Sequence, residues 1–523
     1  MQDDTPCTLP VCGYNGGVSR MPERHSFVAV LHRREQAVLG QRLPHLLLLL
    51  LAAGLVLLLG PSRLPYLDLL RQGDEHAARA ERSAAVTAYR EAACLRPADP
   101  APHLRLAQVY LDWGCTEEAL AALAEAERLD GPDRLRVSAG GPMYPSAYTR
   151  TPGKPVRSLW VAATVARADW PAVVVHARRL LALAPEDRDA RLTLARAYPQ
   201  LQEWERARVE YELLLSVDPA DALAHERLGA LLIGDDPAAI QHLFAARTEL
   251  AGRLLAALGE ASAAGDPAYT RMLVGRVLFE EREWALAAHQ FERALAGAPD
   301  YSDAHAYLGH ALDRMGRSEE ARSHLLRAVE LAPDSAVART FLGLHYDRLG
   351  DVSAARAEYE AAYDLDPQNA ALCVEIGQTW AAEDRYVAAE VWLVQAVSLQ
   401  PDDPALWEAL ARFYVDHQIA GGGRAVEAAA RWVELAPGDA RAHDVRGWAA
   451  FQAGDYGTAR ASLLRAIALD PALAVAHYHL GRLWAAEGAA EQAREAFARA
   501  LDLDTTGELA PLVEIPRCAR NDN

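Results

Sequence analysis

The chain has 523 residues and a formal net charge of −19, with 53 Lys and Arg against 72 Asp and Glu. A chain this acidic is a poor ligand for a nucleic-acid backbone, because phosphate contacts require a basic face. Nearly all basic residues are Arg, with Lys154 the only lysine, which is typical of a GC-rich bacterial genome. The six cysteines are scattered without metal-ligand spacing and predict no metal or redox site.

Residues 1–42 carry several arginines and precede twenty uncharged residues, LPHLLLLLLAAGLVLLLGPS, at 43–62. Each central leucine favours bilayer insertion by roughly 0.3 to 0.6 kcal/mol, and the run is just long enough to span a membrane. It therefore predicts a transmembrane helix acting as a signal anchor. Because positive charge stays inside, we expect a cytoplasmic N-terminus and a periplasmic or extracellular remainder. A cleaved signal peptide, with Met21 as the true start, is the alternative.

The remainder of the chain is organised by a proline that returns every 34 residues, at Pro299, Pro333, Pro367 and Pro401, followed by Pro437 and Pro471. A period of 34 indicates that one supersecondary unit is repeated. Aligning the units on this proline brings a pair of residues into register, namely Leu308-Gly309, Leu342-Gly343, Ile376-Gly377 and Leu480-Gly481. Alanine fills two further columns, the second three residues after a bulky side chain, as in Leu325 and Ala328 or Tyr359 and Ala362.

Each unit predicts two helices joined by a tight turn, since apolar residues recur at three and four residue spacing on both halves. In the unit that begins at Ser302, the turn falls at 315–317. Small residues such as Gly309 are expected to let the helices approach closely. Pro333 ends the second helix, and Asp334 and Ser335 offer capping oxygens for the next one.

These columns resemble those of the tetratricopeptide repeat family, over most of the chain after Tyr66. The resemblance implies an all-α fold, a right-handed α-solenoid of stacked helix-turn-helix units, here preceded by one transmembrane helix. We expect about twelve units, divided as follows: units 1–2 at 66–131, a Gly/Pro-rich loop at 132–153, units 3–5 at 154–267, units 6–12 at 268–507, and a non-repeat tail at 508–523. Residues 222–267 are about twelve residues too long, which a longer second helix would explain.

The sequence carries no catalytic constellation. It has no GxSxG elbow, no GxxxxGK[ST] phosphate loop, no HExxH and no dinucleotide fingerprint after a strand. His305 and His310 lie five residues apart, which does not place two ligands on one helical face. We therefore expect a protein that is not an enzyme and that needs no cofactor.

Binding in a concave groove is the function that the family resemblance implies. In this family the first helix of each unit lines the groove through its second, fifth, sixth, ninth, twelfth and thirteenth positions. Those positions predict the following partner-binding residues: Arg276, Phe279, Tyr307, His310, Arg314, Phe341, Arg348, Arg412, Trp448, Tyr478, His479 and Arg482. Aromatic and Arg side chains suit an extended peptide with carboxylates. Some of these residues are instead expected to pack between adjacent units.

The Lys and Asn residues of the family's carboxylate clamp are missing from the ninth position, so a cytosolic chaperone adaptor is disfavoured. Our leading hypothesis is a membrane-anchored, non-catalytic scaffold for protein partners, with a role in envelope assembly or polysaccharide export. The alternative is an accessory subunit that selects acceptors for a separately encoded glycosyltransferase. Both hypotheses place the lipid bilayer at the N-terminal helix and no nucleic acid among the partners.

Overall fold

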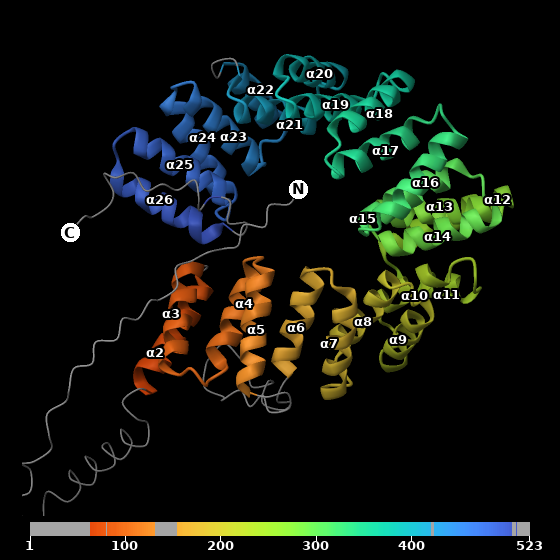
Figure 1. Ribbon diagram of the computed structural model, residues 1–523, viewed down its shortest axis with the longest axis horizontal. Coiled ribbons are helices and arrows are strands. Elements are labelled where there is room, and N and C mark those ends of the chain that lie inside the picture. The colour runs from red at the N-terminus through yellow and green to blue at the C-terminus, as the bar shows by residue number, and fades with distance from the viewer. Residues whose placement is uncertain (1–62, 80, 131–153, 420–422, 505–508, 510–523) are drawn as a thin grey trace, which may run out of the picture. The chain divides into compact units, whose positions relative to one another are not determined.

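The computed structural model describes residues 63–79, 81–130, 154–419, 423–504 and 509 (Figure 1). All of the secondary structure in these ranges is helical, as the repeat pattern predicts. The described helices divide between two compact units, an N-terminal unit of α2–α5 and a C-terminal unit of α6–α26. In each unit the helices form antiparallel hairpins, and each hairpin packs against the next one along the chain.

The N-terminal unit consists of two hairpins, built from α2 (Arg63–Ala78) with α3 (Arg82–Leu95) and from α4 (Ala101–Asp112) with α5 (Thr116–Asp130). A buried polar cluster joins them. The Asp74 carboxylate accepts hydrogen bonds from the Tyr89 hydroxyl and from Arg105 Nε, both at 2.8 Å. All three groups are buried, and the mutual pairing removes the cost of burying each one alone.

The C-terminal unit contains ten hairpins and one additional helix within its described residues. Their bounds are α6 (Lys154–Ala166), α7 (Trp170–Leu183), α8 (Arg188–Gln200), α9 (Trp204–Val217), α10 (Ala222–Leu232), α11 (Ala238–Ala246), α12 (Glu249–Ala264), α13 (Pro267–Glu280), α14 (Trp284–Gly297), α15 (Ser302–Arg314), α16 (Ser318–Leu331), α17 (Ala336–Arg348), α18 (Val352–Leu365), α19 (Ala370–Ala382), α20 (Tyr386–Leu399), α21 (Pro404–Asp416), α22 (Gly423–Leu435), α23 (Ala440–Gln452), α24 (Tyr456–Leu469), α25 (Ala474–Ala486) and α26 (Ala490–Leu503).

The hairpin turns and restarts follow the sequence prediction. The turn at 315–317 lies between α15 and α16, and Gly316 adopts a φ of 80° that favours glycine. Two residues after Pro333, the Ser335 side chain accepts a hydrogen bond from the Ala338 amide and caps α17. The expected capping role therefore belongs to Ser335.

A further hydrogen bond links seven of the prolines to the helix that follows, and the repeat pattern did not predict it. The side chain six residues after the proline donates a hydrogen bond to the proline carbonyl, over 2.8 to 3.1 Å. Arg, His and Trp all fill this position, and the donors are Arg191, His225, His305, Arg339, Trp407, His443 and His477. Each bond satisfies the carbonyl of a proline that lies just beyond the end of the preceding helix.

The hairpin cores depend on the column of glycines in the first helices. A Cβ added to Gly343 would lie 2.5 Å from Tyr359 Cε1, and one added to Gly309 would lie 2.6 Å from Leu325 Cγ. The bulky side chain of the second helix therefore occupies the space of the missing Cβ. This confirms the prediction that small residues allow the two helices to approach.

Residues 222–267 differ from the prediction. Instead of one long second helix, the stretch forms the short helix α11 and the additional helix α12. Arg247 separates them in a left-handed conformation, with φ 54°, and Thr248 then caps α12. Helix α12 packs against α10, α11 and α13, and α14 contacts α8, which lies two hairpins upstream.

The expected transmembrane helix at 43–62 lies outside the described residues, as do the loop at 132–153 and nearly all of the tail at 508–523. Among the helices of the described ranges, none is long and apolar enough to cross a membrane.

Replacing Gly343 with Ala should destabilise the C-terminal unit by about 1 to 3 kcal/mol, since the new methyl overlaps the buried Tyr359 ring. Gly252 on α12 is the matched control, because a Cβ there meets nothing within 4 Å. Gly252→Ala should stabilise the C-terminal unit by about 0.5 to 1 kcal/mol, because alanine has a higher helix propensity than glycine. Denaturant unfolding followed by circular dichroism measures both changes, and equal effects would contradict the packing argument.

Candidate partner-binding surface

The first helices of successive hairpins pack side by side along much of the C-terminal unit, for example α15 against α17 and α23 against α25. We call the face that they form the groove face. Of the twelve predicted binding residues, nine lie in two ring clusters or in a cavity on this face, Arg276 and Arg314 border one of the clusters, and Arg348 has contacts elsewhere. The structure gives their positions, while their contact with a partner stays a prediction.

The first group, the Phe279 cluster, consists of Phe279, Trp284, Tyr307, His310 and Phe341, which are half-buried side chains from α13, α14, α15 and α17. The Phe279 ring centroid lies 5.1 Å from that of Tyr307, 5.2 Å from Trp284 and 5.9 Å from Phe341. Several pairs meet edge to face, the geometry that ring quadrupoles favour. Three consecutive hairpins thus contribute to one aromatic surface.

Two exposed arginines border the Phe279 cluster. The Arg276 guanidinium lies 5.9 Å from the Tyr307 ring centroid, and the Arg314 guanidinium lies 5.5 Å from that of Trp284. Neither forms an ion pair with a carboxylate in the described part of the chain. Their donors are therefore free to bind carboxylates of a ligand in bidentate fashion, beside rings on which the ligand can stack.

His310 is the titratable member of the cluster. Its ring centroid lies 4.7 Å from that of Phe341, and burial lowers the pKa of His310 to about 4, an effect that Asp313 partly opposes. The imidazole is therefore neutral at pH 7 and serves as a ring surface. It adds no positive charge to the two arginines.

The Arg348 side chain makes its contacts within the protein and does not border either cluster. It forms an ion pair with Asp313 and donates a hydrogen bond to the Ser318 hydroxyl at 2.8 Å. The same carboxylate accepts a 2.8 Å hydrogen bond from Nδ1 of His345, a fully buried side chain. These contacts fix α17 to α15, so the guanidinium is engaged within the protein.

The second group, the Trp448 cluster, consists of Trp448, Phe451, Tyr478, His479 and Arg482, from α23 and α25. The Trp448 ring stacks on His479 at 4.2 Å and on Phe451 at 4.8 Å between centroids. Arg482 donates a 2.8 Å hydrogen bond to the Tyr478 hydroxyl and lies 5.8 Å from the Trp448 ring centroid. Tyr478 is buried, and it therefore supports the surface more than it contributes to it.

Arg412 lies between the two clusters, in a cavity of about 580 Å³ between α19 and α21. The cavity walls are rich in alanine, including Ala381, Ala382 and Ala409, and small side chains leave the space open. The Arg412 guanidinium is exposed and lies 3.5 Å from Glu408, a distance at which the pair is weak. A bulky side chain of a bound peptide fits such a recess.

Two residues of these clusters were not predicted. Phe451 occupies a twelfth position and could have been chosen by the rule that selected the other residues. Trp284 begins a second helix, so a rule for first helices excludes it. Its T-shaped contact with Phe279, with an interplanar angle of 84°, depends on how the hairpin closes.

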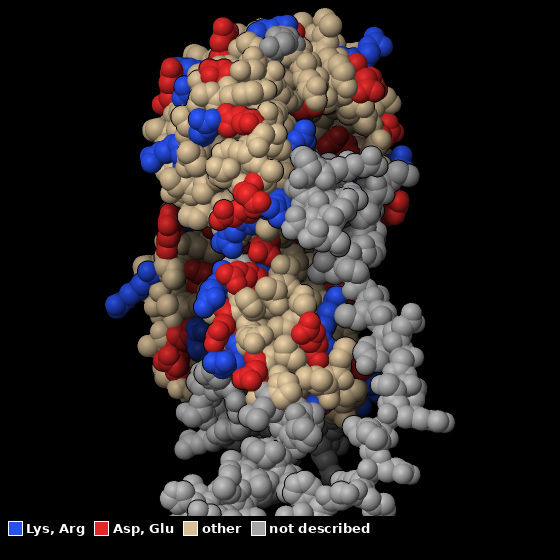
Figure 2. Space-filling view, turned by 90° about the vertical axis from the view of Figure 1, so that its left-hand side faces the viewer, with Lys and Arg blue, Asp and Glu red and all other residues tan. Residues whose placement is uncertain are grey.

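The described residues contain no group of three or more His, Cys, Asp or Glu side chains arranged to hold a metal ion. On the side of the molecule that Figure 2 presents, acidic and basic side chains are interspersed, and neither sign forms a continuous area. The side chains on the groove face offer ring surfaces in the two clusters and exposed guanidinium donors.

Comparisons with known proteins agree with this architecture. A family model described as tetratricopeptide repeat matches residues 273–336, 308–370 and 445–508, and a second model with that description matches residues 348–413. A search of curated proteins finds no match.

Solved structures similar to the chain include YrrB, described as a repeat protein of this type with an unusual peptide-binding site, at 21% identity and a TM-score of 0.32, over 36% of this chain and 96% of YrrB. The APC/C hetero-tetramer Cut9-Hcn1 is similar at 15% identity and a TM-score of 0.37, over 82% of this chain and 98% of that one. Yeast Tom70 is similar at 14% identity and a TM-score of 0.36, over 86% and 93% of the two chains.

We expect His310 to make the protein less stable in acid. Its pKa falls from 6.5 when exposed to about 4 when folded, so the unfolded state binds the extra proton and stability is lost as the pH falls from about 6.5 towards 4. His310→Phe should reduce this loss by about 1 to 2 kcal/mol, because a phenyl ring keeps the aromatic contacts and does not titrate. Urea unfolding at pH 7 and pH 4.5 measures the difference; a parallel pH profile for both proteins would refute the assignment.

Proposed function

Because the chain belongs to the tetratricopeptide repeat family, we propose that it is a non-catalytic scaffold that binds protein or peptide partners on the groove face of its C-terminal unit. The observation that carries the proposal is the Phe279 cluster with its two unpaired arginines. This surface brings together five half-buried rings and has exposed guanidinium groups at its border. It can therefore offer a partner both contact area and charge-assisted hydrogen bonds. Aromatic and arginine side chains are the residues that dominate binding energy at protein interfaces.

The chemistry of the surface specifies a ligand type. Arg276 and Arg314 favour carboxylates, and the rings between them favour an aromatic or aliphatic side chain. The alanine-lined cavity at Arg412 provides a recess for a second bulky side chain farther along the groove face. An extended segment with acidic residues around apolar ones would match this order of groups.

We also propose that the segment at 43–62 anchors the protein in a bacterial cell membrane, with the repeats in the periplasm or outside the cell. The support is the run of twenty uncharged residues and the arginines that precede it. A scaffold in that position would serve envelope assembly or polysaccharide export. Recovery of a glycosyltransferase from detergent-solubilised native membranes would instead favour the role of an acceptor-selecting accessory subunit.

The double variant Arg276→Gln/Arg314→Gln should bind acidic peptides at least tenfold more weakly than the parent, because two charge-assisted contacts of about 1.5 to 3 kcal/mol each are lost. Peptides are first selected from a random displayed library against the full chain, and affinities are then measured by fluorescence anisotropy.

The matched control is Arg322→Gln/Arg465→Gln, which removes two exposed arginines of the second helices α16 and α24 and changes the net charge equally. It should bind as the parent does. Equal affinities for the two double variants, or selection of peptides without acidic residues, would exclude the groove face as the specific site.

A reporter that is active only outside the cytoplasm, fused after Asn523, should give a signal in bacterial cells. Deleting residues 43–62 should abolish this signal, since no other segment with a comparable apolar run precedes the repeats. Enzymatic assay of the fusion measures the outcome, and an active cytoplasmic reporter in its place would reverse the proposed orientation.

A further inference from the structure

A cavity of about 470 Å³ lies within the C-terminal unit, among α6, α8, α10 and the beginning of α14. None of the binding residues predicted from the sequence lines it. Its volume falls in the range of small-molecule sites, which are mostly apolar with a few placed polar groups. None of its lining residues belongs to the Phe279 or Trp448 clusters, so the inference below stands on residues other than those that carry the proposed function.

The additional helix α12 precedes the hairpin that forms one wall of this cavity. Hairpin α13–α14 follows α12, and α14 contacts α8 as well as α9. The Trp204 and His289 rings meet with centroids 4.1 Å apart, and Glu283 at the start of α14 forms a 2.6 Å ion pair with Arg227 of α10. The start of α14 thus forms a wall that a regular stack of hairpins would not supply.

One part of the cavity is apolar. Its apolar lining comes from hairpin α6–α7, through Val161, Val165 and Trp170, and from α14, through Leu286. Val165 remains exposed in this otherwise well-packed unit. A ligand with an aliphatic or aromatic body would bury these side chains and gain roughly 25 cal/mol for each square ångström removed from water.

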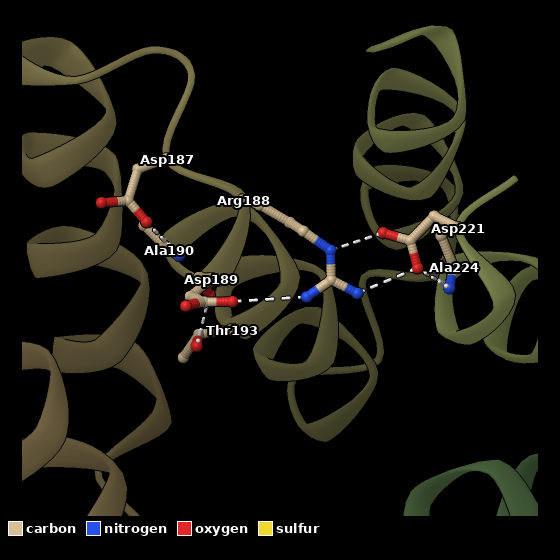
Figure 3. Close-up of polar contacts among 7 residues, drawn as sticks. All are labelled: Asp187, Arg188, Asp189, Ala190, Thr193, Asp221 and Ala224. Atoms are coloured by element: carbon tan, nitrogen blue, oxygen red, sulfur yellow. Dashed lines mark hydrogen bonds and ion pairs between the residues drawn. The ribbon is translucent and has the colours of Figure 1, made fainter. Parts of the chain in front are cut away.

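Most charged groups around the cavity already have partners within the protein. Asp187 accepts a 3.0 Å hydrogen bond from the Ala190 amide. Arg188 binds Asp221 through two hydrogen bonds of 2.6 and 2.9 Å and contacts Asp189 at 3.3 Å (Figure 3). These contacts hold the carboxylates at this end of the cavity in place, so an anionic ligand is expected at the Arg196 side instead.

The donors of the lining that have no such partner include the Arg196 guanidinium and the Tyr211 hydroxyl. Arg196 is exposed and forms no ion pair or hydrogen bond in the described chain, although every other charged side chain of the lining has a partner. Tyr211 is 3% exposed, and its hydroxyl forms no hydrogen bond. Burial raises the pKa of Tyr211, against the opposing effect of Arg227 and Arg196, so the hydroxyl keeps its proton and can donate it.

The Tyr211 hydroxyl has no partner within the described chain, and a bound acceptor would give it one. The Arg196 guanidinium in the same lining supplies the charge that a carboxylate complements. We propose that this cavity binds a small amphiphilic carboxylate, with the anionic group on Arg196 and the Tyr211 hydroxyl and the apolar body against Val161, Val165, Trp170 and Leu286. A free fatty acid and the C-terminal residue of a polypeptide both have this chemistry.

Isothermal titration of the full chain with decanoate and with decanol tests the charge requirement. Decanoate should bind at least tenfold more tightly than decanol, and Arg196→Gln should remove that preference. Arg322→Gln is the matched control, because it removes an exposed arginine of α16 that belongs neither to the cavity nor to the two ring clusters. It should leave decanoate binding unchanged.

Tyr211→Phe keeps the buried ring and removes only the hydroxyl. It should therefore weaken the binding of decanoate severalfold and leave the binding of decanol unaffected. Ala162→Trp, at an exposed position of the lining, should block both ligands while circular dichroism stays at the parental value. These two variants separate loss of the site from loss of folding.

The peptide Gly-Ser-Gly-Ser-Leu-Leu, as free acid and as C-terminal amide, distinguishes the two sources of the carboxylate. Binding of the free acid but not the amide, with weak decanoate binding, assigns the site to a polypeptide C-terminus; the reverse assigns it to a free fatty acid. The proposal is overturned if decanoate and decanol bind equally, if Arg196→Gln keeps the preference, or if neither decanoate nor the free-acid peptide binds.

Discussion

The contact between a glycine of the first helix and a bulky side chain of the second, which most hairpins share, is the constraint on which the fold depends. A hairpin of two short helices buries little surface by itself, so it is stable only when its helices approach closely and a neighbour covers the outer side. Gly275 faces Phe291, Gly447 faces Leu463 and Gly481 faces Phe497 in the same way. The bulky partner changes shape between units, whereas the missing Cβ does not.

Regular packing of this kind gives successive hairpins the same geometry. The geometry changes at residues 222–267. Helix α12 interrupts the alternation of first and second helices and accompanies a contact between α14 and α8. Arg271 secures this arrangement by donating hydrogen bonds to the carbonyls of Ile233 and Gly234, at 3.2 and 2.8 Å. The insertion thus accompanies a partly covered cavity in a fold that otherwise presents an open face.

The sequence predicted the helices well because their ends are encoded locally, by a proline, a capping side chain and a glycine turn. It failed at Arg247, where a residue without glycine's freedom adopts a left-handed conformation and divides one expected helix into two. It also selected most residues of the ring clusters, since helical spacing fixes which side chains share a face. It could not separate Arg314 from Arg348, because the carboxylate that engages Arg348 comes from Asp313 in the preceding hairpin.

The ninth position of the units shows how one register can serve different purposes. Asp74 occupies it in the first hairpin and is buried between Tyr89 and Arg105. Arg196 and Arg276 occupy it in later units, where no carboxylate approaches, and their guanidinium groups remain available. The position in the repeat therefore determines on which face a side chain lies. The neighbouring hairpin determines whether that side chain has a hydrogen-bond or ion-pair partner within the protein. Binding sites in such a chain are found by locating the positions where the neighbour supplies no partner.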